Sequence, residues 1–128
     1  ALASSTHTKK VESHLRLAGF TGFFQAVIGG DMVEHSKPLP DIYWKACQLL
    51  QADPARAVAV EDSPNGIRSA YAAGMLPVMV PDLVQPDPEI EDMLYQRCGS
   101  LFDVRDFLEK KLKEGEVRVY SDMIGGNT

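Results

Sequence analysis

One short stretch, residues 57–67, constrains the fold of this chain more than any other. It begins with four apolar residues, which is typical of a strand buried on both faces of a sheet. The apolar run ends in two adjacent carboxylates, Glu61 and Asp62. Ser63 and Pro64 follow, the residue types favoured at a helix N-cap and at the first helical position. Two acids therefore sit at the carboxyl end of a buried strand, the edge at which open α/β sheets bind ligands.

The adjacent carboxylates of Glu61 and Asp62 repel each other unless a cation or a hydrogen-bond network offsets their charge. Mg²⁺ is a hard cation that prefers oxygen ligands and commonly accompanies phosphate. The alternative interpretation is that both acids only cap the helix that follows. The pair therefore indicates either a cation site or a helix cap.

Apolar strand-like stretches and amphipathic stretches alternate along the chain. Strands are predicted at residues 1–3, 23–28, 57–60 and 76–80, with a candidate edge strand at 101–102, and helices at residues 8–18, 41–51, 89–97 and 104–113 and from Ser63 onward. Strict alternation favours an α/β fold, a Rossmann-like parallel sheet with right-handed crossovers and helices on both faces. We expect residues 1–114 to form one core domain and residues 115–128 a C-terminal tail.

Composition narrows the class of protein. A net charge of -5 and the lack of a basic stripe disfavour a nucleic-acid partner. No apolar run is long enough to cross a membrane, so no membrane partner is expected. Cys47 and Cys98 are far apart and form no C-x-x-C motif, which predicts a reduced, cytoplasmic compartment.

Two further polar stretches lie at predicted strand ends. Ser4, Ser5 and Thr6 follow the first strand, where they can cap the next helix or, with free helix N–H groups, hold a phosphate. Lys37 lies in a loop stiffened by Pro38 and Pro40. We expect the prolines to fix this lysine by restricting the backbone rather than by burying its side chain, so that its charge can meet phosphate oxygens. The alternative is an ordinary exposed lysine.

Three sequence blocks, at residues 2–6 (LASST), 36–42 (SKPLPDI) and 60–67 (VEDSPNGI), occur in this order at predicted strand ends. Together they resemble the haloacid dehalogenase-like hydrolase superfamily, in particular the phosphatases and phosphomutases similar to β-phosphoglucomutase. The resemblance covers roughly residues 1–82. It implies the C-terminal core of a Mg²⁺-dependent enzyme that acts on a small phosphorylated metabolite through an aspartyl-phosphate.

The resemblance also implies roles for individual residues. Ser4 matches the hydroxyl that binds the transferring phosphoryl group, and Lys37 matches the lysine that neutralises its charge. Asp62 matches the Mg²⁺ ligand, with Glu61 as its neighbour in the metal shell. The positions where members of this group contact phosphate or substrate are occupied by Ser5, Thr6, Ser63 and Asn65.

One departure from the family pattern matters for function. The first family motif, a strand followed by Asp-x-Asp-Gly, supplies the nucleophile, and neither it nor the cap domain that follows it is found in these 128 residues. The chain opens as if inside a strand, which suggests a piece of something longer. The resemblance places the motif's strand centrally, between the strand that ends at Ser4 and the strand that ends at Asp62. We therefore expect an incomplete sheet that needs this segment from a nicked remnant, a swapped strand or a second chain.

One consequence and two alternatives follow. Without a nucleophile the chain alone is expected to show essentially no turnover. A second hypothesis is a non-catalytic domain that folds on a partner and at most binds phosphate. A receiver-type signalling domain also uses acids, a hydroxyl and a lysine, but there the acids come first, whereas here they come last.

Overall fold

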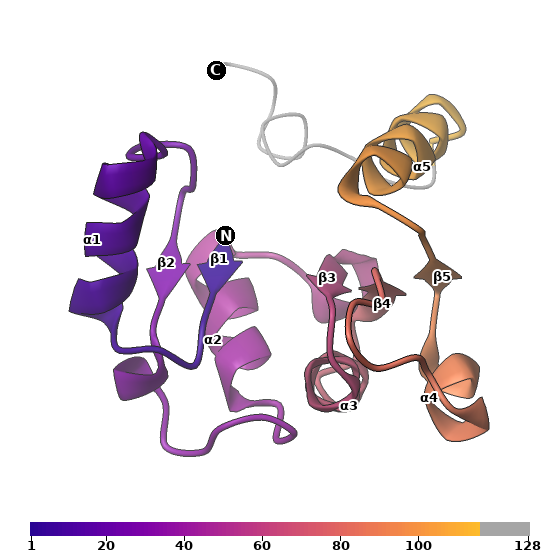
Figure 1. The fold of residues 1–128 in the computed structure, drawn as a ribbon, viewed down its shortest axis with the longest axis horizontal. Helices are drawn as coiled ribbons and strands as arrows, with labels where there is room; N and C mark the ends of the chain where they lie inside the picture. Colours follow the sequence, from indigo (N-terminus) through magenta and orange to yellow (C-terminus); the bar gives the residue numbers. More distant parts are fainter. Residues whose placement is uncertain (116–128) are drawn as a thin grey trace.

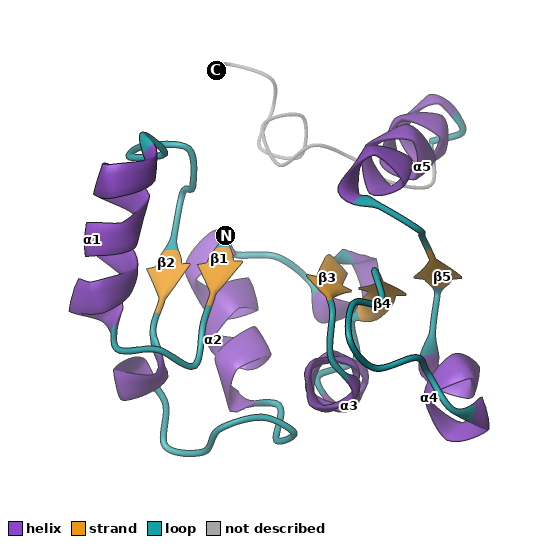
Figure 2. Cartoon of the chain, viewed as in Figure 1, coloured by secondary structure: helices purple, strands orange, loops and turns teal. Residues whose placement is uncertain are grey.

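The computed structural model describes residues 1–115, in which parallel strands alternate with helices (Figures 1 and 2). The strands are β1 (Leu2–Ala3), β2 (Val27–Ile28), β3 (Val58–Glu61), β4 (Leu76–Met79) and β5 (Gln96–Arg97). The helices are α1 (Thr8–Ala18), α2 (Asp41–Leu50), α3 (Pro64–Ala72), α4 (Pro88–Met93) and α5 (Leu101–Lys113), with short 3₁₀ turns at Gly30–Met32 and Pro54–Arg56. The predicted α/β class is therefore confirmed. The predicted tail, residues 115–128, lies outside the described residues except for its first position.

Within residues 1–115 the strands form two separate parallel sheets, β1–β2 and β3–β4–β5. Figure 1 shows them in one row, in the order β2, β1, β3, β4, β5, with α5 on one side of the row and α3 and α4 on the other. β1 and β3 are adjacent in the row but unpaired. This arrangement confirms the expected incomplete sheet, interrupted between the strand that ends before Ser4 and the strand that ends before Asp62. We call β1–β2 with α1 the first half, and β3–β4–β5 with α3, α4 and α5 the second half.

Helix α2 joins the two halves through one shared hydrophobic core. The buried members of this core come from β2, α2, β3, α3 and the turn after α3, and they are Ile28, Ile42, Tyr43, Ala46, Cys47, Ala59, Ala70, Ala73 and Met75. Two smaller cores lie entirely in the second half: Ile67, Met79 and Ile90 in one, and Val78, Cys98 and Val104 in the other. The second half therefore has cores of its own, whereas the first half depends on α2.

Several predicted helix ends are confirmed in atomic detail. Gly19 ends α1 with a left-handed φ of 78°, which glycine adopts without a Cβ penalty. Ser63 begins α3, where its hydroxyl accepts a hydrogen bond of 3.1 Å from the N–H of Gly66. The burial of Cys47 and Cys98 raises the pKa of both free thiols, in agreement with packing roles for these side chains.

The predicted strand at residues 23–28 is wrong over most of its length, because only Val27–Ile28 pairs with β1. Gly22 has a positive φ of 84°, and the N–H of Phe23 donates to the carbonyl of Phe20 at 3.3 Å. The chain is therefore still turning where the apolar residues suggested an extended strand, and Phe23 is exposed.

The predicted boundaries after β4 are also wrong. The helix predicted at 89–97 ends at Met93, because the following residues pair with β4: the N–H of Cys98 donates to the carbonyl of Met79 at 2.9 Å. The candidate edge strand at residues 101–102 is instead the first turn of α5. Ser100 caps this helix by accepting from the N–H of Asp103 at 3.2 Å.

Strand β3 differs from the prediction in its burial. Ala59 is buried, whereas Val60, on the opposite face of the strand, is 41% exposed. Within residues 1–115, β3 has the composition of a central strand but pairs with β4 only, so its other edge is unpaired. No helix in residues 1–115 is both long and apolar enough to cross a membrane.

Candidate active site

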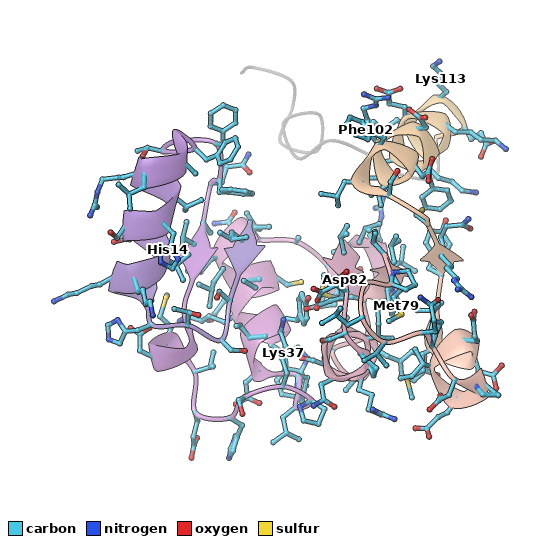
Figure 3. All side chains as sticks on the ribbon, in the orientation of Figure 1. His14, Lys37, Met79, Asp82, Phe102 and Lys113 are labelled. Carbon is cyan, nitrogen blue, oxygen red and sulfur yellow. The ribbon has the colours of Figure 1, made fainter. Side chains whose placement is uncertain are left out.

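A cavity of about 710 Å³ opens between β1 and β3, at the carboxyl ends of the strands. Its polar lining consists of Ser4, Ser5, Lys37, Tyr43, Glu61, Asp62 and Asp82, and its apolar lining includes Leu2, Ala3, Val60, Val80, Pro81 and Leu101. Figure 3 shows Lys37 between the two halves of the molecule. The fold therefore brings five of the predicted site residues into one cavity, while Thr6, Ser63 and Asn65 do not line it.

The side chains of Lys37 and Glu61 form a buried ion pair, in which Nζ donates to Oε1 and the side chains are 16% and 8% exposed. The hydroxyl of Tyr43 donates to the same oxygen. Burial, and then the negative charge of Glu61, raise the pKa of Tyr43, so its hydroxyl stays protonated and remains a donor. The Lys37 Nζ also lies 5.4 Å from the centroid of the Tyr43 ring. Glu61 on β3 and Tyr43 on α2 thus fix the ammonium group of Lys37. The alternative of an ordinary exposed lysine is therefore wrong. The expectation that the backbone fixes Lys37 without burial of its side chain is also wrong, because the side chain is only 16% exposed.

Gly66 makes room for the Glu61 carboxylate on the first turn of α3. A Cβ at this position would collide with both carboxylate oxygens and with Cδ of Glu61. The glycine in the E-D-S-x-x-G block therefore has a packing role that no other residue can take without moving the acid.

The loop that carries Lys37 is anchored at both ends. The buried hydroxyl of Ser69 donates to the carbonyl of Leu39 at 2.6 Å, which ties the loop to α3. At the other end the N–H of His35 donates to Asp41 Oδ2 at 3.2 Å, and His35 Nδ1 lies 3.0 Å from the same oxygen. The position of Lys37 thus depends on α3 and α2 as well as on its prolines.

The turn that follows β1 is held by the neighbouring strand. The hydroxyl of Ser4 accepts a hydrogen bond of 3.1 Å from the N–H of Thr6. The carbonyl of Thr6 in turn accepts from the N–H of Gly30 at 2.9 Å. Gly30 approaches so closely that a Cβ would collide with the carbonyl of Ser5. The hydroxyls of Ser4 and Ser5 therefore line the cavity from a turn of fixed shape.

The N–H groups at the start of α1 already have protein acceptors. The N–H of Thr8 donates to Asp31 Oδ1 at 2.6 Å, and the N–H of Lys9 donates to His7 Nδ1 at 3.3 Å. Together with the N–H of Thr6, three donors are therefore occupied. These three N–H groups are therefore not free, and the predicted phosphate contact of this turn stays a prediction.

The two adjacent acids have different surroundings. Glu61 is buried and binds Lys37, whereas Asp62 is exposed and lines the cavity, as does Asp82. The side-chain cap of α3 is made by Ser63, so the interpretation of the acids as helix caps fails for Glu61. The predicted substrate contacts of Ser63 and of Asn65, which is exposed on α3, stay predictions.

The donor chemistry of Asp62 suits Mg²⁺, because the ion prefers carboxylate oxygens. Within residues 1–115, however, no three His, Cys, Asp or Glu side chains lie close enough together to hold a metal ion. Glu61 Oε1 already accepts from two donors, so its predicted metal role stays a prediction. The described residues thus fit Mg²⁺ in ligand type but need additional oxygen ligands.

Comparison with known proteins identifies the family. The sequence pattern described as "Haloacid dehalogenase-like hydrolase" matches residues 1–80, which is more than half of the chain. The chain belongs to this family. The matched residues include Ser4, Lys37, Glu61 and Asp62, so these four cavity residues lie within the matched segment.

Individual haloacid dehalogenase-like relatives support the assignment. The chain is 34% identical over 111 residues to the bifunctional riboflavin kinase/FMN phosphatase of Arabidopsis thaliana, covering 86% of this chain and 28% of that protein. It is 35% identical over 75 residues to the phosphorylated carbohydrates phosphatase of Thermotoga maritima, covering 59% of this chain and 35% of that protein. The crystal structure of CbbY from Rhodobacter sphaeroides in complex with phosphate superposes with a TM-score of 0.68 at 36% identity, over 77% of this chain and 44% of that one. The chain thus spans less than half the length of each of these proteins.

Sequence reasoning missed two cavity residues, Tyr43 and Asp82. Tyr43 follows Ile42 on the apolar face of α2, and nothing in that pattern separates a core tyrosine from one that bonds a buried acid. Asp82 comes directly after the predicted strand at residues 76–80 and Pro81, so its position at a strand end was the available signal.

Proposed function

We propose that this chain is the C-terminal core of a Mg²⁺-dependent phosphatase or phosphomutase that acts on a small phosphorylated metabolite. The observation that carries the proposal is that one cavity is lined by the fixed ammonium group of Lys37, the hydroxyl of Ser4 and the carboxylate of Asp62. Phosphoryl transfer depends mainly on positioning and charge stabilisation, and these are the groups it requires. The FMN and phosphorylated-carbohydrate phosphatases among the relatives support a phosphate monoester of a small molecule as substrate.

Each residue has a distinct part in this proposal. Lys37 offsets the negative charge of the phosphoryl oxygens, and its buried partner Glu61 keeps it in place. Ser4 binds a phosphoryl oxygen through its hydroxyl, and Ser5 and Thr6 shape the turn around it. Asp62 holds Mg²⁺, with Glu61 in its neighbourhood, and the bound ion supplies further charge neutralisation.

The nucleophile comes, in this proposal, from an extended segment that lies between β1 and β3. In the described part of the chain, the edges of β1 and β3 that face each other are both unpaired, and this supports such an added strand. An Asp-x-Asp motif at its carboxyl end would place an aspartate beside Lys37, and an aspartyl-phosphate would form there. The segment comes from elsewhere in the intact protein or from a second chain, and the 128-residue chain alone is inactive. We place the enzyme in the cytoplasm, where the free thiols of Cys47 and Cys98 stay reduced.

A second candidate function is phosphate binding without catalysis, in a domain that folds on a partner. The observation that favours it is that no Asp-x-Asp motif occurs in the 128 residues. The two functions predict different results when a segment with a nucleophile is added: the enzyme core then releases phosphate from a substrate, whereas the binding domain does not.

The test is phosphate release from a panel of sugar phosphates and FMN. The chain is co-expressed with a strand segment that ends in Asp-x-Asp-Gly, and release is measured with Mg²⁺ and with a chelator. We expect Mg²⁺-dependent release that Lys37→Ala and Asp62→Asn each reduce by at least about 100-fold. Lys113→Ala and Asp92→Asn, at exposed positions on α5 and α4, serve as matched controls and leave it unchanged. Phosphate binding without release by the complemented protein would favour the second candidate.

A further inference from the structure

Tyr43 stands out among the residues around the cavity because its buried hydroxyl bonds the same carboxylate that holds Lys37. It lies on α2, the helix that joins the two halves, and is a member of the shared core. Its hydroxyl donates to Glu61 Oε1, the oxygen that also accepts from Lys37 Nζ. A tyrosine needed only for packing could be a phenylalanine, so the hydroxyl requires its own explanation.

Two donors on one oxygen restrict Glu61 in a specific way. The carboxylate is pressed between Tyr43 on α2 and Gly66 on α3, where a Cβ has no room. Without the hydroxyl, Glu61 would keep one donor and regain rotational freedom about its side-chain bonds. The ammonium of Lys37 would then follow the carboxylate and lose its fixed place in the cavity.

This geometry also divides the two adjacent acids. Oε1 of Glu61 is committed to Tyr43 and Lys37, whereas Asp62 is exposed and bonded to neither. Oε1 of Glu61 therefore sets the lysine, while the neighbouring Asp62 has its carboxylate open to a cation.

We propose that Tyr43 is a positioning residue for phosphate recognition: its hydroxyl locks Glu61, and Glu61 in turn aims the Lys37 ammonium at the phosphoryl site while Asp62 is left for the cation. This inference rests on the proposed function of the cavity, because it assumes that Lys37 meets phosphate. According to this inference, Tyr43, a core residue of α2, contributes to the affinity for phosphate.

The experiment compares Tyr43→Phe with wild type in two binding measurements, each on the chain co-expressed with the strand segment that ends in Asp-x-Asp-Gly. Inorganic phosphate is titrated by isothermal calorimetry, and Mn²⁺, as a paramagnetic substitute for Mg²⁺, by electron paramagnetic resonance. We expect Tyr43→Phe to weaken phosphate binding by about 5- to 10-fold, the effect of losing one hydrogen bond to a charged group. Mn²⁺ affinity should stay within about twofold, because Asp62 is untouched. Tyr71→Phe, at an exposed tyrosine on α3, is the matched control and should change neither value.

A second measurement does not depend on phosphate. In ¹⁵N-lysine-labelled chain the Nζ signal of Lys37 should be visible through slowed proton exchange, because the ammonium is hydrogen-bonded and mostly buried. Tyr43→Phe should broaden or remove that signal, and Tyr71→Phe should not.

Three outcomes would count against the inference. Unchanged phosphate affinity together with an unchanged Lys37 signal in Tyr43→Phe would overturn it while leaving the proposed function intact. An equal loss of phosphate and Mn²⁺ binding would show a merely structural role. If wild-type and Lys37→Ala chains bind phosphate equally, the proposed function itself fails, and this inference fails with it.

Discussion

The two halves of the molecule are stabilised in different ways. The second half has two cores of its own, built on Met79 and Val78, and three paired strands. The first half has two short strands, and its buried Ile28 belongs to the core that is shared through α2. The cavity lies where the halves meet, and the Lys37–Glu61 pair joins the loop before α2 to the second half. The difference teaches that one helix, α2, both joins the two halves and contributes Tyr43 to the cavity. Substitutions that disturb the packing of the shared core should therefore also weaken ligand binding.

The largest effect is expected from Glu61→Ala, which removes the acceptor of two buried donors. The uncompensated charge of Lys37 and the unpaired hydroxyl of Tyr43 should lower the free energy of unfolding by about 3–5 kcal/mol. Phosphate binding should be lost as well. Urea denaturation provides the stability measurement, and Glu91→Ala, which removes an exposed pair with Arg97, should cost at most about 1 kcal/mol. Equal losses of unfolding free energy in the two variants would show that the hydrogen bonds of Glu61 to Lys37 and Tyr43 do not stabilise the fold.

A matched pair of core variants separates the halves. Ile42→Ala on α2 and Ile90→Ala on α4 each remove a buried isoleucine and should each lower the free energy of unfolding by about 2–5 kcal/mol. Only Ile42 lies in the core shared by the halves, so only Ile42→Ala should also weaken phosphate binding, measured by calorimetry on folded protein. Phosphate affinities that fall together in both variants would mean that the halves are not distinct.

Gly66→Ala tests whether the Glu61 carboxylate packs against the first turn of α3. In a solvent-exposed helix this change stabilises by about 1 kcal/mol. Here the added methyl group collides with the acid, so we expect a net destabilisation of about 1–3 kcal/mol. Gly99→Ala is the control, since its Cβ would meet only one flexible carboxylate, that of Asp103 at 3.2 Å. A stabilised Gly66→Ala variant would show that Glu61 does not sit against α3.

The smallest effect is expected at acidic pH, in the dependence of the free energy of unfolding on pH, and it arises from Asp31 beside the first half. Hydrogen bonds from the backbone N–H and hydroxyl of Thr8 lower the pKa of Asp31. A carboxyl whose pKa is lower in the folded state adds stability above its unfolded-state pKa, and this contribution disappears as the pH falls through the folded-state value. Wild type should therefore lose stability below about pH 4 more steeply than Asp31→Asn, as urea midpoints at a series of pH values would show. A constant difference between the two proteins at every pH would contradict the assignment.

Much of the fold could be predicted because local signals coincided with tertiary structure. The strand that ends at Glu61 and the cap at Ser63 were readable from the order of apolar, acidic and helix-starting residues. Boundaries failed where tertiary pairing decided them. Residues 96–97 form a strand because β4 offers a free edge, which no local propensity reveals.

The site was predictable only in part, for a similar reason. The positions of Ser4, Lys37 and Asp62 near predicted strand ends were enough to predict that they meet at one sheet edge, where they line the cavity. The bond between Tyr43 and Glu61 joins residues that are 18 positions apart on different elements, so sequence spacing could not show it. The sequence shows a glycine at position 66, but it does not show that the Glu61 carboxylate packs against this glycine.

The most direct test of the account is a map of phosphate binding on the ¹⁵N-labelled chain, co-expressed with the strand segment that ends in Asp-x-Asp-Gly. The central claim is that residues from both halves form one phosphate site. Adding inorganic phosphate should shift the amide signals of Ser4 and Ser5 in the first half together with those of Lys37 and Asp62, with one common affinity. Shifts confined to one half, or to exposed lysines such as Lys10 and Lys113, would contradict it.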